Sequence, residues 1–338
     1  MKINNRRYIG CKAKLLDFIY STVATYSKPD YKVFADIFAG TGVVGNYFAD
    51  KGYKVIINDT LYSNVVAYTA WLGEGKIDHD KISNILKHVN SIDGANLESN
   101  YFSDVYGGKY FSVNDAKKIG YIRDYIESIK TDLNDREFAY ILTSLIYATD
   151  KIANTVGHFE SFLSKAPQDK GVELLGLEIN HSLSTSADIY NADANALCRE
   201  IVCDVAYIDP PYNARQYVNF YHVLENLARW NKPTEFEGNS MKFKRKELKS
   251  DYCRGKAPEL MRDLIMNLNC KLIVVSYNNT YKAGSISSVN TITSEQLINI
   301  LAERGKVSIK EIDYKAFNSG KTELNGHKEL LYICEVNS

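Results

Sequence analysis

The sequence carries no net charge, because 41 lysine and arginine residues are balanced by 41 aspartate and glutamate residues. A nucleic acid bound by this chain must therefore be held by locally clustered basic side chains, not by a global positive field. Apolar residues fill 45% of the 338 positions, which is ordinary for a globular protein. A chain of this length is expected to form one elaborated domain or two.

The cysteines and histidines lack the spacings of metal sites and disulfide frameworks. None of the six cysteines forms a C-x-x-C pair, and none of the six histidines lies in an H-x-x-x-H or H-E-x-x-H pattern. Scattered cysteines in a long chain favour reduced, intracellular thiols. The N-terminal residues are not followed by a signal-peptide apolar segment, and no stretch approaches the ~20 apolar residues of a membrane span. We therefore expect a soluble, cytoplasmic protein without a metal or a membrane partner.

The pattern around which the chain is organised lies at residues 33–59. An apolar run predicts a buried strand, a glycine turn and an amphipathic helix follow, and a second strand ends on Asp59. This order is typical of a nucleotide-binding βαβ unit, in which glycines let the backbone approach a ligand and the helix N-terminus offers free N–H groups. The carboxylate of Asp59 suits ribose hydroxyls. The glycines of the turn are Gly40, Gly42 and Gly45.

This glycine motif fits two cofactors. The spacing Gly40-x-Gly42-x-x-Gly45, with Asp59 about 20 residues further on, satisfies the dinucleotide fingerprint. The same unit fits S-adenosylmethionine. Asp36 favours the second cofactor, because a carboxylate ahead of the glycines can face the methionine ammonium and would repel a pyrophosphate.

The most specific signal is the tetrad Asp-Pro-Pro-Tyr at 209–212, which follows a short apolar strand predicted at 205–208. Two consecutive prolines cannot continue a central strand, so they fix the backbone and direct the flanking side chains to one place. An acid and an aromatic ring at the carboxyl end of a strand lie where α/β sheets bind ligands. The candidate catalytic residues are Asp209, Pro210, Pro211 and Tyr212.

A mostly helical insertion is predicted at residues 74–182, where Asn134 and Glu137 have the spacing of a capping box. Such an insertion either recognises a macromolecular substrate or packs against the sheet. Residues 229–256 are rich in lysine and arginine and predict an exposed basic loop, which is either solvated surface or a phosphate contact.

The C-terminal residues complete the predicted sheet. Segments 307–314 and 329–336 predict a strand pair, joined by a polar loop at 318–327. The pair brings the sheet to about seven strands. Three further short motifs belong to the pattern: Tyr8-Ile9-Gly10-Cys11-Lys12, Asp193 after a short strand, and Ser276-Tyr277-Asn278-Asn279 at the end of a buried strand.

These motifs together resemble the D12 class of DNA adenine-N6 methyltransferases. In that class a lysine-bearing N-terminal motif precedes the glycine motif, and a target-recognition insertion precedes Asp-Pro-Pro-Tyr, which is the order found here. The run at 209–217, with Ser276–Asn279, is similar to restriction–modification methylases of the class. Cys11 departs from the glycine that maintenance-type members tend to carry.

The resemblance implies an α/β, Rossmann-like S-adenosylmethionine-dependent methyltransferase fold. Its catalytic domain would comprise residues 1–73 and 183–338, and 74–182 would be the target-recognition domain. The cofactor would be S-adenosylmethionine, converted to S-adenosylhomocysteine without a metal. The implied cofactor-binding residues are Tyr8, Lys12, Asp36, Phe38, Gly40, Gly42, Asp59 and Asp193.

The same resemblance implies residue roles. Lys12 and Asp36 would hold the methionine carboxylate and ammonium, Asp59 the ribose, and Asp193 the cofactor adenine. Asp209 and the Pro210 carbonyl would accept hydrogen bonds from the N6 amino group of an adenine flipped out of double-stranded DNA, and Tyr212 would stack on that base. The implied DNA-binding residues are Lys242, Lys244, Arg245, Lys246 and Arg215.

The expected activity is the methylase of a restriction–modification system, acting on DNA as a monomer beside a separate cognate endonuclease. Methylation of RNA adenine or of DNA cytosine N4 by the same tetrad is an alternative. A nicotinamide-dependent oxidoreductase is a more remote one, and a non-catalytic DNA-binding subunit conflicts with the intact tetrad.

Overall fold

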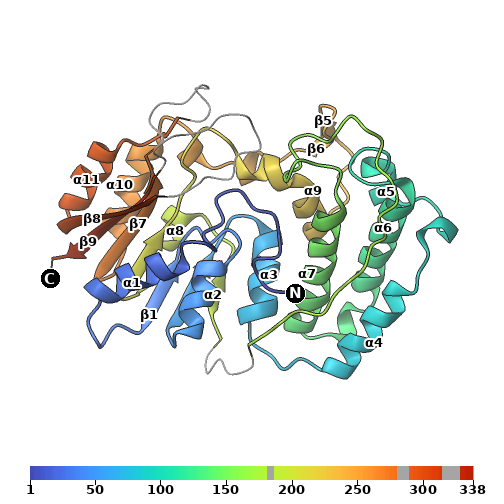
Figure 1. Cartoon of the computed structure of the whole chain (residues 1–338), viewed down its shortest axis with the longest axis horizontal. Helices are drawn as coiled ribbons and strands as arrows, with labels where there is room; N and C mark the ends of the chain where they lie inside the picture. The colour runs from blue at the N-terminus through green and yellow to red at the C-terminus, as the bar shows by residue number, and fades with distance from the viewer. Residues whose placement is uncertain (181–185, 280–288, 314–327, 338) are drawn as a thin grey trace. The chain divides into compact units, whose positions relative to one another are not determined.

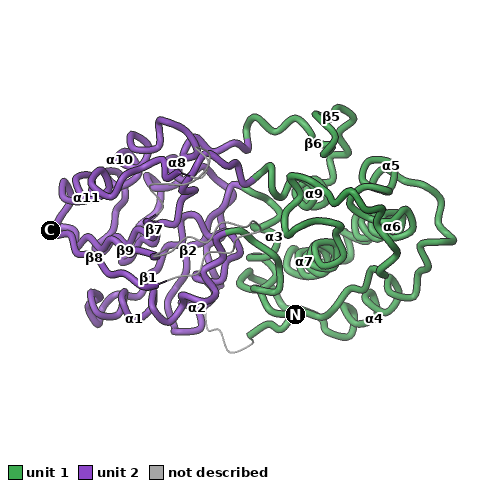
Figure 2. Tube along the Cα trace, turned by 45° about the horizontal axis from the view of Figure 1, so that its top comes forward, with its two compact units in different colours: residues 1–9, 61–181, 218–247 green, residues 10–60, 182–217, 248–338 purple. Residues whose placement is uncertain are grey.

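The computed structural model describes residues 1–180, 186–279, 289–313 and 328–337 (Figure 1). The polar loop expected at 318–327 therefore lies outside the described residues. The chain divides into two compact units, each assembled from separate stretches of sequence (Figure 2). Unit 1 consists of Met1–Ile9, Leu61–His181 and Val218–Glu247, and unit 2 of Gly10–Thr60, Ser182–Tyr217 and Leu248–Ser338.

Unit 2 is built on a mixed sheet in which the described residues form seven strands, in the order β3-β2-β1-β4-β7-β9-β8. The first five strands in this order are parallel, and β9 runs antiparallel to both of its neighbours. The predicted α/β sheet and its C-terminal strand pair are confirmed. The strands are β1 (Val33–Asp36), β2 (Lys54–Asn58), β3 (Asp188–Tyr190), β4 (Val205–Ile208), β7 (Leu272–Asn278), β8 (Gly305–Asp313) and β9 (Lys328–Val336).

Helices cover both faces of this sheet, because the side chains of a strand alternate between its two faces. Phe34 of β1 stacks on Phe48 of α2, with ring centroids 3.7 Å apart. Its neighbours Ala35 and Ile37 are buried in the core on the other side. Figure 2 shows α1 and α2 on one side and α8, α10 and α11 on the other. These helices are α1 (Leu16–Tyr26), α2 (Val43–Asp50), α8 (Ala194–Leu197), α10 (Ala257–Asn267) and α11 (Ser294–Ala302).

The centre of the sheet positions the candidate site. Strand β1 pairs with both β2 and β4, so the chain order reverses there. Open α/β sheets bind ligands at such a reversal, beyond the carboxyl ends of the strands. Asp36 lies opposite Tyr207 in the β1–β4 pair. Asp59 directly follows β2, and Asp209 directly follows β4. Three of the predicted acids therefore come to the same edge of the sheet.

Unit 1 is largely helical and contains the segment predicted as an insertion together with α3 and α9. The capping box predicted at the start of α7 is confirmed: Asn134 accepts from the Glu137 N–H, and the Glu137 carboxylate accepts from the Asn134 N–H. Residues 153–180 form neither helix nor strand. The regular elements are α3 (Tyr62–Leu72), α4 (His79–Asn90), α5 (Tyr101–Tyr106), α6 (Val113–Ser128), α7 (Asp135–Ile152), α9 (Tyr217–Arg229), β5 (Phe236–Glu237) and β6 (Lys242–Phe243).

Three general features of the sequence can be compared with the structure. No helix within the described ranges is long and apolar enough to cross a membrane. All six cysteines belong to the described part of the chain and carry free thiols. Over the same residues, no group of three or more histidine, cysteine, aspartate or glutamate side chains could hold a metal ion.

Candidate active site

The glycine turn after β1 has the geometry of a ligand cradle. Gly40 and Gly42 have φ angles of 55° and 77°, a region that side-chain-bearing residues seldom adopt. The N–H of Gly40 donates to Asp59 Oδ2 at 2.9 Å, so the turn is tied to the end of β2. Gly45 has a different reason to be glycine: a Cβ there would lie 2.9 Å from Ile57 Cδ1. The third glycine therefore serves packing of α2 against the sheet.

Asp36 is the buried acid beneath this turn, with 1% of its surface exposed. Its Oδ2 accepts from the Gly45 N–H at 3.0 Å. Its Oδ1 is buried and has no hydrogen-bond partner among the described residues. Burial raises the pKa of Asp36 to about 8, with Asp209 and Asp59 adding to the effect of burial. A buried acceptor without a donor fits a cationic group of a ligand, as the S-adenosylmethionine ammonium would be.

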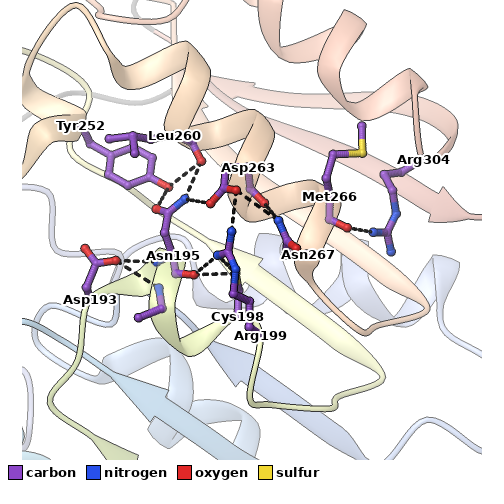
Figure 3. A network of polar contacts seen from close by, with 11 residues as sticks. Asp193, Asn195, Cys198, Arg199, Tyr252, Leu260, Asp263, Met266, Asn267 and Arg304 are labelled. Carbon is purple, nitrogen blue, oxygen red and sulfur yellow. Dashed lines mark hydrogen bonds and ion pairs between the residues drawn. The ribbon is translucent and has the colours of Figure 1, made fainter.

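Asp193 belongs to a polar network that joins the start of α8 to Tyr252 and to α10 (Figure 3). Its Oδ1 caps α8 by accepting from the N–H groups of Asn195 and Ala196. Asn195 in turn receives a 2.8 Å hydrogen bond from the Tyr252 hydroxyl. The Tyr252 ring meets Phe38 edge to face, with centroids 5.1 Å apart. The network therefore links Asp193, predicted to bind the cofactor adenine, to Phe38, predicted to bind the cofactor.

Asp209 lies in a compact polar cluster at the end of β4. Lys12 Nζ is 3.1 Å from Asp209 Oδ1 and donates to the Tyr212 hydroxyl at 2.7 Å. The Tyr212 hydroxyl lies 2.5 Å from the same Asp209 oxygen. The tetrad and the N-terminal lysine, which are far apart in sequence, are therefore brought together, and both contacts fall on one oxygen of Asp209.

The second oxygen of Asp209 is left open. Across the residues that the structure describes, neither Asp209 Oδ2 nor the Pro210 carbonyl has a hydrogen-bond partner. The Asp209 side chain is 17% exposed, so a ligand can reach it. Burial raises the pKa of Asp209 to about 6, which Lys12 opposes and Glu329 reinforces. At neutral pH the end of β4 therefore presents an ionised acceptor, and the next residue offers a carbonyl acceptor.

Glu329 is the member of this cluster that the sequence analysis missed. It is 2% exposed, and its Oε1 lies 3.0 Å from Lys12 Nζ. Burial would raise the pKa of Glu329, but Lys12 and the hydrogen bond from Tyr212 lower it below its ordinary value. Burial would likewise lower the pKa of Lys12, but Asp209 and Glu329 raise it. A glutamate in an apolar C-terminal strand, with no motif around it, gave no local signal of this role.

Lys12 was predicted to hold the methionine carboxylate, and that role remains a prediction. In the structure its ammonium faces Asp209, Glu329 and the Tyr212 hydroxyl, one acceptor for each of its three N–H donors. Tyr212 was predicted to stack on the target base. Its ring lies 4.8 Å from Lys12 Nζ and 4.5 Å from the Tyr277 ring centroid.

The remaining predicted residues divide between the two units. Tyr8 belongs to unit 1, where its ring stacks on Tyr221 at 4.6 Å and its hydroxyl accepts from Asn64. The predicted lysines and Arg245 also belong to unit 1, on the β5–β6 hairpin and the turn after it. Arg215 belongs to unit 2 and is exposed in the segment between β4 and α9.

The basic segment differs from the exposed loop that was expected. It contains the β5–β6 hairpin, and Arg245 is only 6% exposed. Its guanidinium donates to Asn219 Oδ1 at 2.8 Å and to Glu237 Oε2 at 2.9 Å. Because these contacts satisfy Arg245 within unit 1, it braces the hairpin and is a poor candidate for phosphate contact. Lys244 and Lys246 are exposed, and Lys244 pairs with Glu235.

Comparison with known proteins identifies the family. Residues 8–305 match the sequence profile of the D12 class N6 adenine-specific DNA methyltransferases. The chain is 37% identical to the modification methylase StsI of Streptococcus sanguinis, over 97% of this chain and 52% of that protein. It is 31% identical to the type II methyltransferase M.NlaIII of Neisseria lactamica, over 97% of this chain and 98% of that protein.

The chain belongs to the D12 class of N6 adenine-specific DNA methyltransferases. It spans about half the length of several curated relatives, including M.FokI of Planomicrobium okeanokoites, with which it shares 32% identity. Membership removes the nicotinamide-dependent oxidoreductase alternative. The seven-stranded α/β sheet found among the described residues agrees with a methyltransferase fold that uses S-adenosylmethionine.

Proposed function

We propose that this protein transfers a methyl group from S-adenosylmethionine to the N6 amino group of adenine in a specific sequence of double-stranded DNA. The observation that carries the proposal is the arrangement of Asp209: one oxygen is anchored by Lys12 and Tyr212, while neither the other oxygen nor the carbonyl of the next residue, Pro210, has a hydrogen-bond partner among the described residues. Family membership supports adenine as the target. The relatives' names support a modification methylase. We propose further that it acts in the cytoplasm as a monomer on DNA, beside a separate nuclease.

The residues of unit 2 fit the cofactor. We propose that Asp36 holds the methionine ammonium, that the Gly40–Gly42 turn lies against the methionine portion, and that Asp59 takes the ribose hydroxyls. Asp193 and Phe38 would bind the cofactor adenine, with Tyr252 supporting Phe38 from the side. When bound, S-adenosylmethionine supplies an electrophilic methyl group.

Asp209 and Pro210 would prepare the target amine. The N6 lone pair of adenine is delocalised into the ring, so N6 is a poor nucleophile. An N6–H bond to Asp209 Oδ2 and another to the Pro210 carbonyl favour a tetrahedral nitrogen whose lone pair is free to attack. The same two acceptors stabilise the positive charge that develops on N6, and they are already in place before the reaction.

Tyr212 is proposed to link the stacked target base to the carboxylate of Asp209. An adenine can enter the site only after leaving the duplex, which costs a few kcal/mol of unstacking. Stacking on one aromatic ring returns ~1–3 kcal/mol, so the ring of Tyr212 offsets a large part of that cost. Because the Tyr212 hydroxyl also contacts Asp209, the ring and the carboxylate are held in a fixed relation.

Cofactor binding at about pH 7 is expected to release close to one proton, because Asp36 has a pKa of about 8 in the ligand-free protein and must ionise to pair with an ammonium. Affinity should therefore rise with pH up to about 8. Calorimetric titration in buffers of different ionisation enthalpy measures the released proton, and Asp36→Asn should abolish it. A binding enthalpy that does not change with the buffer would contradict the assignment.

The lysines of the basic segment are proposed to contact DNA phosphates. Lys242, Lys244 and Lys246 lie on or directly after β6, within a few residues of one another. Phosphate contacts position a protein on the duplex without reading its sequence. The helices of unit 1 are the proposed source of sequence recognition, in line with the target-recognition role predicted for 74–182.

Replacing Lys244 and Lys246 together with alanine is expected to weaken DNA binding and to reduce the slope of log K against log salt by about 1.8, since each lost phosphate contact removes ~0.9. Fluorescence anisotropy over a salt series measures the slope. The matched control replaces Lys306 and Lys310, two exposed lysines of β8, and removes the same total charge. Equal slopes in the two double variants would assign the basic segment to solvated surface.

The proposed function is tested by incubating the purified chain with isotope-labelled S-adenosylmethionine and either duplex DNA or RNA. After digestion to nucleosides, we expect label in N6-methyldeoxyadenosine from DNA only. Label in N4-methyldeoxycytidine or in a ribonucleoside would favour the alternative amine substrates. The full-length match to M.NlaIII supports testing this chain alone.

A further inference from the structure

Glu329 occupies a position that the proposed reaction does not by itself require. It lies on β9 opposite Asn278 of β7, and Ser276 is on the same face of β7, two residues away. The Ser276 hydroxyl donates to Glu329 Oε1 at 2.8 Å. A strand at this place could carry an apolar side chain, as its neighbours Leu330 and Leu331 do. The fold of the strand therefore does not by itself explain a buried carboxylate at this position.

One oxygen of Glu329 collects three donors. Besides Ser276, Oε1 is 3.0 Å from Lys12 Nζ and 2.6 Å from the Tyr212 hydroxyl. Lys12 and Tyr212 are the same two groups that contact Asp209 Oδ1. The two carboxylates thus share one ammonium and one phenolic proton. The Tyr212 hydroxyl has a single hydrogen, so it can donate to only one of the two carboxylates at a time.

The charge balance of the cluster is unusual for a buried site. One ammonium stands against two carboxylates, so the cluster carries a net negative charge when both acids are ionised. Lys12 and Asp209 alone would make a neutral pair, in which the ammonium would hold Asp209 tightly and weaken it as an acceptor. A second carboxylate in contact with Lys12 competes with Asp209 for the ammonium and so weakens its attraction to Asp209.

We propose that Glu329 is a positioning residue for methyl transfer. It competes with Asp209 for Lys12 and for the Tyr212 hydroxyl, and this competition keeps Asp209 a strong acceptor for the N6 amino group. This inference rests on the proposed function. Glu329 touches neither substrate nor cofactor in this account and acts through Lys12 and Tyr212. The added negative charge also favours the cationic amine that forms as the methyl group is transferred.

The test measures how kcat/KM depends on pH, because its acid limb reports ionisation of the free enzyme. Asp209 must be ionised to accept, so the wild-type limb is expected near its pKa of about 6. Glu329→Gln removes a negative charge that raises this pKa, so the limb should move down by about one pH unit. The plateau rate should fall several-fold while KM for DNA stays within about twofold. The charged and titratable groups that face Asp209 and Glu329 among the described residues are Lys12, Asp36, Tyr207, Asp209, Tyr212, Tyr217 and Glu329.

Two further variants keep the proposal falsifiable. Glu329→Asp withdraws the carboxylate by one methylene and should give a smaller shift in the same direction, which can be read even if the glutamine variant does not fold. Glu335→Gln changes an exposed glutamate of the same strand and should leave the profile unmoved. If the Glu329 variants have a lower plateau rate but an acid limb of kcat/KM at the same pH as the wild type, Glu329 has a merely structural role. Absence of methyl transfer by the wild-type protein would instead overturn the proposed function.

Discussion

Replacing Asp209 with alanine is expected to lower the rate of methyl transfer by at least about a hundred- to a thousandfold, the range seen when one preorganised charge-stabilising contact is removed. The variant loses the acceptor at Oδ2, so the N6 lone pair stays delocalised. It should still fold, because Lys12 keeps Glu329 as its buried partner at 3.0 Å. Cofactor binding should change by only a few-fold, since Asp36 and the glycine turn are unaltered.

The matched control for this variant is Asp204→Ala. Asp204 directly precedes β4 and lies at the opposite end of that strand from Asp209. Its Oδ2 accepts from the N–H groups of Lys32 and Val33, a structural role. This variant should lose thermal stability but keep its turnover per folded molecule within a few-fold. Single-turnover assays and calorimetric cofactor titrations separate the two outcomes, and an Asp209→Ala protein that methylates at the wild-type rate would refute the mechanism.

Replacing Lys12 with methionine is expected to lower the free energy of unfolding by about 3–5 kcal/mol, the cost of leaving a buried charge without its partner. Lys12 is 5% exposed and forms ion pairs with both Asp209 and Glu329. Without it the two carboxylates repel each other, and the pKa of at least one rises. Activity at about pH 7 should fall, because Asp209 then carries a proton in a larger fraction of the molecules.

The pH dependence of this loss identifies its origin. The raised pKa of Lys12 means that its stabilisation is fully present below the ordinary lysine pKa and is lost only as pH rises through the folded value. The loss of unfolding free energy in the methionine variant should therefore grow between about pH 5 and pH 8, as the two carboxylates ionise without Lys12 to balance them. Urea unfolding at several pH values measures it, and a deficit independent of pH would contradict this account.

The same variant separates two roles for Lys12. Resemblance to the family places its ammonium on the methionine carboxylate, whereas the ligand-free structure places it on Asp209, Glu329 and Tyr212. If Lys12 holds the cofactor, the methionine variant should raise the dissociation constant for S-adenosylmethionine at every pH. If Lys12 serves the carboxylate pair, the effect should fall on the methyl-transfer rate and on stability.

Much of the fold was predictable because its signals are local. The apolar run before Gly40, the turn itself and Asp59 lie within 33–59, and they form β1, α2 and β2 as expected. The two prolines after β4 exclude a continued strand, so the sequence also located Asp209 at the strand's end. The capping box at Asn134 needs only four residues and was found for the same reason.

The features that could not be predicted depend on contacts between distant residues. Glu329 acquires its role from the register of β9 against β7, which places it near Ser276 and Lys12. Arg245 looked like a surface cation in a run of lysines, but Asn219 and Glu237 bury it. No periodicity or local motif in the sequence reports such pairings.

The division into units was equally hidden from local patterns. The unit that holds 74–182 also takes in α3, most of α9 and the β5–β6 hairpin. These elements flank the glycine motif and the tetrad in sequence, so the order of motifs assigned them to the catalytic part. Their place in unit 1 follows from helix packing, such as that between α3 and α7, which no motif encodes.

The measurement that tests the central claim most directly is base-resolution mapping of modified nucleotides in the DNA of a host that expresses this protein. We expect N6-methyladenine at one adenine of a single recognition sequence, and none in a host that expresses Asp209→Ala. Modified cytosine in place of adenine, or modification that persists in the Asp209→Ala host, would contradict it.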